Sequence, residues 1–319
     1  MKRVSLLLGI AAAIAFGGVA SAQGDYPNQM VRIIVPFSAG SITDGLARIL
    51  ADKLSIEWKQ QVIVENRAGL AGTTFVAKAP PDGYTLMLTS NGHTIAAVIN
   101  KNLQFDPVKD FAGVSRVAAV PMVMIVPTDF PAKTLKEFLQ MAKDKPGQMN
   151  FSSAGVASTS FLSAEIMRQN AQVNMVHVPY KGAPEAVTAV VRGDAQMYFA
   201  PIPSAQELGA AGKVRVMAIN SGKRMPQLPD TPTVAESGLP DYKYESWFGV
   251  MAPAGTPKPL LDKVSRDIAA VLAMADVKEK LEVQGSFPAP NKPEEFDAII
   301  KSDTERYGKI LRDAGVGTN

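Results

Sequence analysis

Cysteine is absent from all 319 residues, and histidine occurs only at His93 and His177. The absence of cysteine excludes disulfides, thiol nucleophiles and cysteine-ligated metals. The two histidines stand in no metal-ligand spacing such as H-E-x-x-H, so neither a metal nor a cofactor is expected. The chain also has no G-x-S-x-G nucleophile elbow and no phosphate-binding loop ending in Gly-Lys-Ser/Thr. The usual sequence signatures of catalysis are therefore missing.

Clustered positive charge is missing as well. The chain has 33 Lys and Arg against 30 Asp and Glu, and loss of Lys2 and Arg3 with a leader brings 33 down to 31. Nucleic-acid binding calls for a basic stripe, and binding to a membrane surface calls for clustered Lys and Arg. No nucleic-acid partner is expected.

A long apolar run occurs only at the start of the chain. Lys2 and Arg3 precede an apolar run over 4–19, which ends in Ala20-Ser21-Ala22. This order predicts a signal peptide over 1–22, cleaved after Ala22, and a soluble product exported to the periplasm. The alternative is a membrane anchor, but the run contains glycines and is shorter than the roughly 20 residues that a spanning helix needs.

Strand-like and helix-like segments alternate along the rest of the chain. Strands are expected at 31–35, 62–64, 84–89, 121–127, 150–152, 173–179, 195–200, 215–219 and 247–252. Helices are expected at 43–54, 73–78, 93–99, 135–143, 159–169, 184–193, 260–272, 276–283 and 293–311. Such alternation predicts an α/β fold with helices on both faces of each sheet. The simplest arrangement is two lobes, with the chain crossing between them near 123–126 and 246–250.

Two strand-to-helix turns are rich in small residues. One runs from Phe37 to Ser41 before a helix, and the other from Ser153 to Ser158 before another helix. Small residues let a backbone approach a ligand closely, and a helix start presents unpaired N–H groups that suit a carboxylate. Ordinary helix capping by Ser and Thr explains such turns equally well. A third polar turn, 89–92, follows another predicted strand and adds to the binding interpretation.

Seven motifs together resemble those of the Bug family, the substrate-binding receptors of tripartite tricarboxylate transporters. In chain order they are IVPFSAG at 34–40 with Asp44, VENR at 64–67, PDGYTL at 81–86, DP at 106–107 with DF at 110–111, HVPYKG at 177–182, LPDTPT at 228–233 and APAGTP at 252–257. The resemblance extends over nearly all of the chain after the predicted signal peptide.

The resemblance implies a type II periplasmic binding protein fold, with two α/β lobes around a ligand cleft and two crossover strands. Residues 23–124 and 247–319 would form lobe 1, and residues 125–246 would form lobe 2. Backbone amides would capture a small carboxylate, and no Arg or Lys would contact it. Carried over by position, the ligand-binding residues are Phe37, Ala39, Gly40, Ser41, Thr43, Asp44, Ser90, Gly155, Ser158, Thr159, Pro201 and Ser204.

Three departures from the family pattern lie at or near this predicted site. Ser41 stands where the family usually has glycine, Phe161 stands where a histidine is common, and RAGLAG at 67–72 replaces a run that is usually richer in Pro and Gly. The ligand therefore need not be one of the family's common ones. Dicarboxylates, amino acids, aromatic acids and their amides all stay open.

Three functions stay open on this basis. The first is a monomeric transport receptor that delivers a carboxylate to membrane permease subunits. The second is a sensory binding protein that presents its closed form to a signalling partner. The third, a hydrolase or isomerase, needs a nucleophile with a base. Near either turn in sequence, Asp44 is the only acid and there is no histidine.

Overall fold

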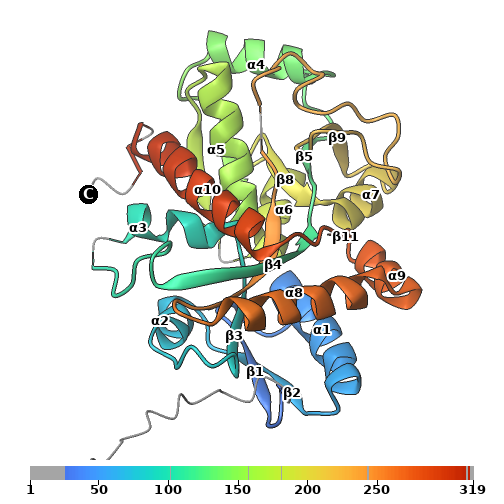
Figure 1. The fold of residues 1–319 in the computed structure, drawn as a ribbon. Helices are drawn as coiled ribbons and strands as arrows, with labels where there is room; N and C mark the ends of the chain where they lie inside the picture. The colour runs from blue at the N-terminus through green and yellow to red at the C-terminus, as the bar shows by residue number, and fades with distance from the viewer. Residues whose placement is uncertain are drawn as a thin grey trace, which may run out of the picture.

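The computed structural model describes residues 26–100, 102–156, 158–180, 182–242, 244–313 and 315–316. The predicted signal peptide and its cleavage after Ala22 lie outside these ranges. The described chain forms two α/β lobes, one above the other in Figure 1, with helices α8 to α10 at their boundary. None of the helices among the described residues is long and apolar enough to cross a membrane.

The first lobe is built on a six-stranded sheet with the order β11-β4-β10-β3-β1-β2. Its strands are β1 (Val31–Val35), β2 (Val62–Asn66), β3 (Thr85–Ser90), β4 (Phe111–Ala119), β10 (Trp247–Pro253) and β11 (Phe287–Pro288). Strands β2 and β3 run parallel to β1, whereas β10 runs antiparallel to both β3 and β4.

Strand β1 shows why this sheet is covered on both faces. Val31, Ile33 and Val35 are buried in one core with α1 (Ile42–Trp58) and α8 (Lys258–Ala273). Ile34 points the other way, into a core with α2 (Leu70–Ala77) and α10 (Pro293–Asp313). Successive side chains of a strand point to opposite faces, so a continuous apolar strand needs helices on both sides.

The second lobe repeats this plan. Strands β5 (Met122–Pro127), β8 (Tyr198–Pro201) and β9 (Val214–Ile219) form one sheet, in the order β8-β5-β9, and β6 (Asn150–Ser153) pairs with β7 (Val176–Pro179). The Ser152 N–H donates to Met197 O at 3.0 Å, which joins β6 to the β8 side. The order is therefore β7-β6-β8-β5-β9, which matches β2-β1-β3-β10-β4 of the first lobe.

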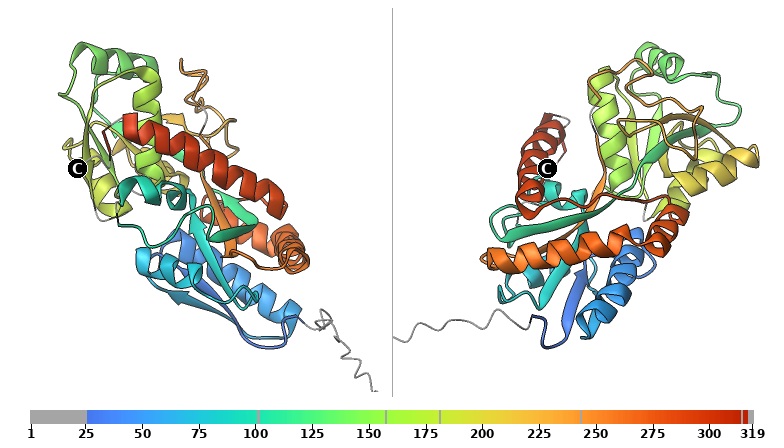
Figure 2. Two further views of the ribbon diagram at one scale, coloured as in Figure 1. Left: turned by 60° about the vertical axis from the view of Figure 1, so that its left-hand side comes forward. Right: turned by 45° about the vertical axis from the view of Figure 1, so that its right-hand side comes forward.

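The helices complete the two lobes. The first lobe also contains the 3₁₀ helix η1 (Asn91–Ile95), α3 (Ala96–Ile99) and α9 (Ala275–Val283), and the second contains α4 (Leu135–Asp144), α5 (Thr159–Ala171), α6 (Ala183–Val191) and α7 (Ile202–Ala210). Helix α10 packs on β4 and η1 of the first lobe and also contacts α5 of the second. The tail thus packs on the first lobe and in addition contacts the second (Figure 2).

The two crossover segments are joined by hydrogen bonds. The chain leaves β4 and enters β5 through Val120 and Pro121, and it returns into β10 after Ser246. The Ser246 hydroxyl accepts from the Val120 N–H at 3.3 Å and donates to the Val120 carbonyl. The predicted limit between residues 124 and 125 falls inside β5, which pairs only with second-lobe strands. We propose that the first lobe limit lies at Val120–Pro121.

Three elements were not predicted from sequence: β4, α7 and β11. Strand β4 is the longest strand of the first sheet, yet Gly113, Ser115 and Arg116 interrupt its apolar pattern. The sheet tolerates Ser115 because its hydroxyl is buried and bonds Asn291 O at 3.1 Å. The helix predicted over 93–99 is helical in the structure, which divides it into η1 and α3 and begins it two residues earlier, at Asn91.

We expect Ser246→Ala to lower the free energy of unfolding by about 1–3 kcal/mol, because it leaves the buried Val120 N–H without its partner. Urea unfolding followed by circular dichroism measures this change. Ser221→Ala is the matched control, since the Ser221 hydroxyl bonds Lys223 O at an exposed position. Equal losses of unfolding free energy in the two variants would contradict a stabilising role for Ser246 at the hinge, the place where the two crossover segments pass.

Candidate functional site

The carboxyl ends of the parallel strands in both lobes lie at the lobe boundary. Ser90, the last residue of β3, pairs with Phe248 at the start of β10, just after the crossover. Pro201, the last residue of β8, pairs with Met122 at the start of β5, just after the other crossover. Open α/β sheets bind ligands at such strand ends. The loops that follow β1, β3, β6 and β8 are therefore the candidate site.

The first-lobe loop is held in place by Asp44. This buried carboxylate accepts from the Gly40 N–H at 2.9 Å and from Asn66 Nδ2 at 3.0 Å. Asn66 Nδ2 also donates to Phe37 O at 3.2 Å, so a single network holds both ends of the loop. Arg48, one turn along α1, pairs with Asp44 at 2.9 Å. The carboxylate of Asp44 is thus bonded within its own loop, and the Gly40 N–H already donates to it and is not free for a ligand.

The electrostatics of this network favour the ionised carboxylate. Burial by itself would raise the pKa of Asp44. Hydrogen bonds from Arg48, the Gly40 N–H and Asn66, together with the Arg48 charge, outweigh burial and lower the pKa below its ordinary value of 3.8. Asp44 therefore carries its charge at neutral pH, and part of the guanidinium charge of Arg48 is neutralised.

The second-lobe loop is held by serines. Ser153, at the end of β6, accepts from the Gly155 N–H at 3.1 Å. The Ser158 hydroxyl donates to Gly155 O at 2.6 Å and accepts from the Phe161 N–H at 3.2 Å. Ser160 Oγ accepts from the Ala154 N–H at 3.1 Å. The loop is fixed by its own polar groups before any ligand arrives.

Helices α1 and α5 begin in the same way. Ser41 caps α1 by accepting from the Asp44 N–H at 3.2 Å, and Ser158 caps α5 through Phe161. In each helix the serine hydroxyl accepts from the N–H of the third residue. The N–H groups of the first two residues have no partner among the described residues. These are the N–H groups of Ile42 and Thr43 in α1, and of Thr159 and Ser160 in α5. Such groups, with the positive end of the helix dipole, suit a carboxylate.

The remaining predicted residues lie at the same strand ends but differ in exposure. Ser90 is buried, and its hydroxyl accepts from the Gly92 N–H at 3.4 Å. Pro201 ends β8 and precedes α7, and Ser204 lies in the first turn of that helix. Ala39 is exposed, whereas Phe37 and Gly155 are half-buried. The structure therefore places the predicted residues at four strand-to-helix connections at the lobe boundary, in strand ends, loops and the first turns of helices.

Sequence reasoning missed His177. Strands β6 and β7 pair in parallel, which brings His177 Nε2 to 2.6 Å from Ser153 Oγ. The imidazole stacks on Phe151, with ring centroids 4.8 Å apart, and contacts Phe161 in a tilted arrangement at 4.7 Å. Phe161 is thus a core residue below the loop, and its departure from the family pattern changes this packing. Only the motif HVPYKG pointed to His177, and it did not indicate Ser153 as the partner.

The described residues contain no group of three or more His, Asp or Glu side chains arranged to hold a metal. The serine–histidine pair is also poorly placed for nucleophilic attack. Ser153 is fully buried, and its oxygen already accepts from the Gly155 N–H. The arrangement supports a loop of fixed shape that presents neutral donors.

A family model described as the tripartite tricarboxylate transporter family receptor matches residues 46–316. This chain belongs to that receptor family. The solved periplasmic binding protein BugD is 33% identical, with a TM-score of 0.76, and the match covers 91% of this chain and 99% of BugD. The fold is accordingly that of the receptor family's two-lobed periplasmic binding proteins, and the family indicates a periplasmic location.

Two other solved structures of similar fold contain carboxylates. An adipate-bound protein of R. palustris is 31% identical, with a TM-score of 0.79 over 91% of this chain and 99% of that one. MatC of Rhodopseudomonas palustris, with bound malate, is 29% identical, with a TM-score of 0.75 over 90% of this chain and 100% of that one. These neighbours are binding proteins that take small dicarboxylates.

We expect Asp44→Asn to lower the free energy of unfolding by about 1–3 kcal/mol at pH 7, because an amide cannot accept all of the bonds made by the carboxylate. The pKa of Asp44 is lowered in the folded protein. Its contribution is therefore complete above about pH 3.8 and is lost as the pH falls through the folded pKa. Denaturant unfolding at pH 7 and in acid should show the difference from the native chain shrinking. The exposed Asp129 supplies the control variant Asp129→Asn.

Burial lowers the pKa of His177 from 6.5 to about 4, despite the opposing charge of Glu165. An NMR titration of the imidazole should therefore give a midpoint near 4. Between pH 6.5 and 4 the unfolded chain binds more protons at this residue, so stability should fall as the pH falls through this window. His177→Phe identifies the resonance by removing it. A midpoint near 6.5 would mean that the ring is solvated and does not pack as described.

Proposed function

We propose that this chain is a periplasmic solute-binding protein that captures a small carboxylate between its lobes for a tripartite tricarboxylate-type transporter. The observation that carries the proposal is the pair of serine-capped helix starts. Each presents two backbone N–H groups without a partner among the described residues, at strand ends that meet at the lobe boundary. The adipate and malate bound by related proteins make dicarboxylates the first ligands to test.

Neutral donors suit a receptor that must release its ligand. Backbone N–H groups make strong hydrogen bonds to a carboxylate, and no buried Arg or Lys has to be stripped of water in each cycle. Arg48, the basic residue of the α1 network, is paired with Asp44. We therefore propose that the carboxylate is bound without a direct Arg or Lys contact.

Binding without chemistry is the better account of this site. An acyl-transfer enzyme needs an accessible nucleophile next to its base. Here the Ser153 hydroxyl beside His177 is buried and holds the Gly155 loop. The pair acts, in this proposal, as a support for the loop that binds the ligand.

The first test is a thermal-shift panel on residues 23–319, unfolded and refolded to remove any carried-over ligand. Adipate, malate and other small carboxylates are compared with their methyl esters. A ligand at 100 times its Kd stabilises a protein by about 2.7 kcal/mol, which raises Tm by several degrees at this size. A shift with an acid but not with its ester supports carboxylate capture. No shift with any carboxylate would contradict it.

Proline at the first helical position tests the donors themselves. Thr159→Pro removes one N–H from the start of α5, and the extended backbone of Ser158 accommodates a following proline. We expect Kd for the carboxylate found above to rise about tenfold, in line with loss of one charge-assisted hydrogen bond. Isothermal titration calorimetry measures this Kd.

Two control variants isolate the N–H from other effects. Thr159→Ala removes the side chain and keeps the N–H, so its Kd should stay close to that of the native chain. Ala275→Pro places proline at the exposed start of α9, after the extended Met274, and should leave binding unchanged. Normal affinity in Thr159→Pro would exclude this N–H from the site.

A further inference from the structure

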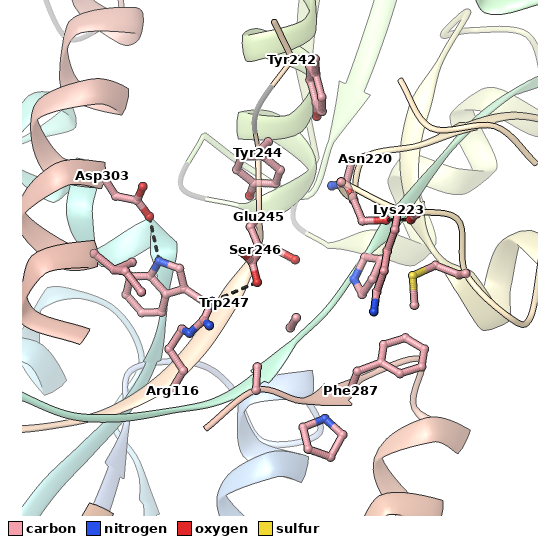
Figure 3. Close-up of a pocket in the computed structure, with 18 of the residues that line it drawn as sticks. Arg116, Asn220, Lys223, Tyr242, Tyr244, Glu245, Ser246, Trp247, Phe287 and Asp303 are labelled. Atoms are coloured by element: carbon pink, nitrogen blue, oxygen red, sulfur yellow. Dashed lines mark hydrogen bonds and ion pairs between the residues drawn. The ribbon is translucent and has the colours of Figure 1, made fainter. Parts of the chain in front are cut away.

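A cavity lies at the hinge, where the two crossover segments pass, with a volume of about 770 Å³. Figure 3 shows Arg116, Trp247 and Asp303 on one side of it, Asn220 and Lys223 on the other, and Phe287 below. Its walls come from both lobes and from the crossover segments. Volumes of roughly 300–1,000 Å³ are typical of small-molecule sites.

This hinge cavity is separate from the candidate carboxylate site. It is lined by the ends of β4, β10 and β11 and by the segment after β9, and none of the residues predicted to bind the carboxylate lines it. In the first sheet, β3 and β1 lie on the side of the carboxylate site and β11 lies on the side of the hinge cavity. Strands β10 and β4 run between them. In the second lobe, β5 separates the β8 side from the β9 side. The hinge thus has a site on each side.

The hinge cavity contains basic groups that are not fully used. Arg116 donates to Glu245 at 2.9 Å, but its Nε is buried and has no hydrogen-bond partner among the described residues. Arg306 donates to the Tyr307 hydroxyl at 2.7 Å, and its Nε is likewise buried without a partner there. A buried donor left without a partner is destabilising, and an anionic occupant that accepts from it removes that penalty.

The acids of the hinge cavity are already engaged. Glu245 pairs with Arg116, and Asp303 accepts from Trp247 Nε1 at 2.8 Å. Burial raises the pKa of Asp303 above its ordinary value, against the opposing effects of the Trp247 hydrogen bond and the Arg306 charge. Arg306 also lies 3.8 Å from Asp303, so two of the three basic residues are paired with acids. Lys223 is left over, which gives the lining a net positive charge and favours an anion.

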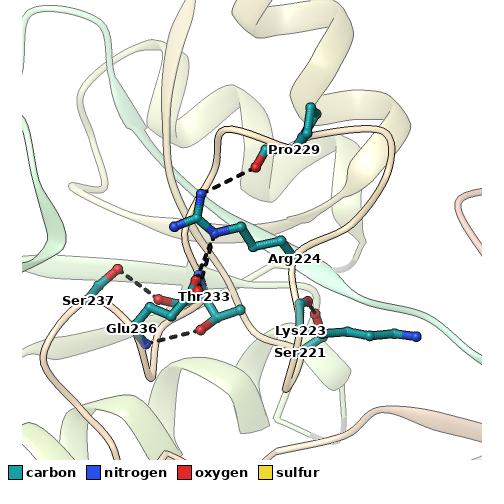
Figure 4. Close-up of polar contacts among 7 residues, drawn as sticks. All are labelled: Ser221, Lys223, Arg224, Pro229, Thr233, Glu236 and Ser237. Atoms are coloured by element: carbon teal, nitrogen blue, oxygen red, sulfur yellow. Dashed lines mark hydrogen bonds and ion pairs between the residues drawn. The ribbon is translucent and has the colours of Figure 1, made fainter.

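Lys223 lies on a loop that is held by an ion pair and hydrogen bonds. Arg224 pairs with Glu236 at 3.0 Å, Glu236 accepts from the Thr233 N–H at 2.8 Å, and Ser221 donates to Lys223 O at 2.6 Å. The ammonium group of Lys223 points away from this network (Figure 4) and has no ion-pair partner within the described ranges. The loop fixes the base of Lys223 and leaves its charge available to an occupant.

Most of the remaining lining is apolar or aromatic, beside the polar Asn220, Ser221 and Ser246. It includes Met225, Pro226, Tyr242, Tyr244, Phe287 and Ile299. We propose that the hinge cavity binds an organic anion with an apolar body, its acid group toward Arg116 and Lys223. Because both lobes form the walls, its occupancy is coupled to the angle between them. This coupling rests on the proposed carboxylate capture, whereas the binding site itself does not.

The probe is 8-anilinonaphthalene-1-sulfonate, an aromatic anion that fluoresces when it enters an apolar site. We expect saturable binding of one dye per chain. Arg116→Met and Lys223→Met should each raise the dye Kd about tenfold or more, as expected for loss of a charge-assisted contact. Gly222→Trp should abolish binding, because it adds a large side chain at a residue that lines the cavity, where an added Cβ meets no atom within 4 Å. The exposed Lys213 supplies the control Lys213→Met, and Gly222→Ala is the control for size.

Native dye affinity in Gly222→Trp, or in both charge variants, would overturn the site. The dye Kd should also change at least severalfold when the carboxylate is present, and the carboxylate Kd should change by the same factor when the dye is bound. An unchanged dye Kd would overturn the coupling. Thr159→Pro keeps the hinge cavity, so it should bind the dye normally even where carboxylate binding fails, and this separates the two proposals.

Discussion

Each lobe contains one strand that has just crossed from the other lobe, β10 in the first and β5 in the second, and that strand runs antiparallel to its neighbours. A strand entering from the hinge begins at the lobe boundary, so the strands antiparallel to it must end there. This constraint brings the ends of β3 and β8 to the same boundary, together with the loops after β1 and β6. The hydrogen bonds between Ser246 and Val120 hold the two crossovers together where they pass.

The loops at this boundary are fixed by groups that do not themselves face a ligand. Asp44 holds the loop before α1 through Gly40 and Asn66, and Ser153, supported by His177, holds the loop before α5. The polar side chains of these loops hydrogen-bond within the loops themselves. The first two N–H groups of α1 and of α5 have no partner among the described residues. A site of this kind costs little to empty, because its donors are neutral and already oriented before the ligand arrives.

The same hinge that brings the loops together has a second face. There the end of β4, the start of β10 and the segment after β9 enclose the cavity between Arg116 and Lys223. Any change in the angle between the lobes must alter both faces, since both are built from parts of each lobe. Protein interiors are close-packed and not continuously deformable, so occupants on the two faces are expected to influence one another.

The sequence by itself determined the α/β class, most of the elements and the two helix starts, because apolar periodicity and capping are local. It placed α5 at Thr159 correctly and α1 one residue late. Family motifs implied the two lobes. Only the tertiary structure decided what those loops touch. The contact of Ser153 with His177 depends on the register of β6 against β7, and that of Asp44 with Asn66 on β1 pairing with β2. Strand β4 escaped prediction because Ser115 and Arg116 find their partners 176 and 129 residues along the chain, at positions that no local pattern records.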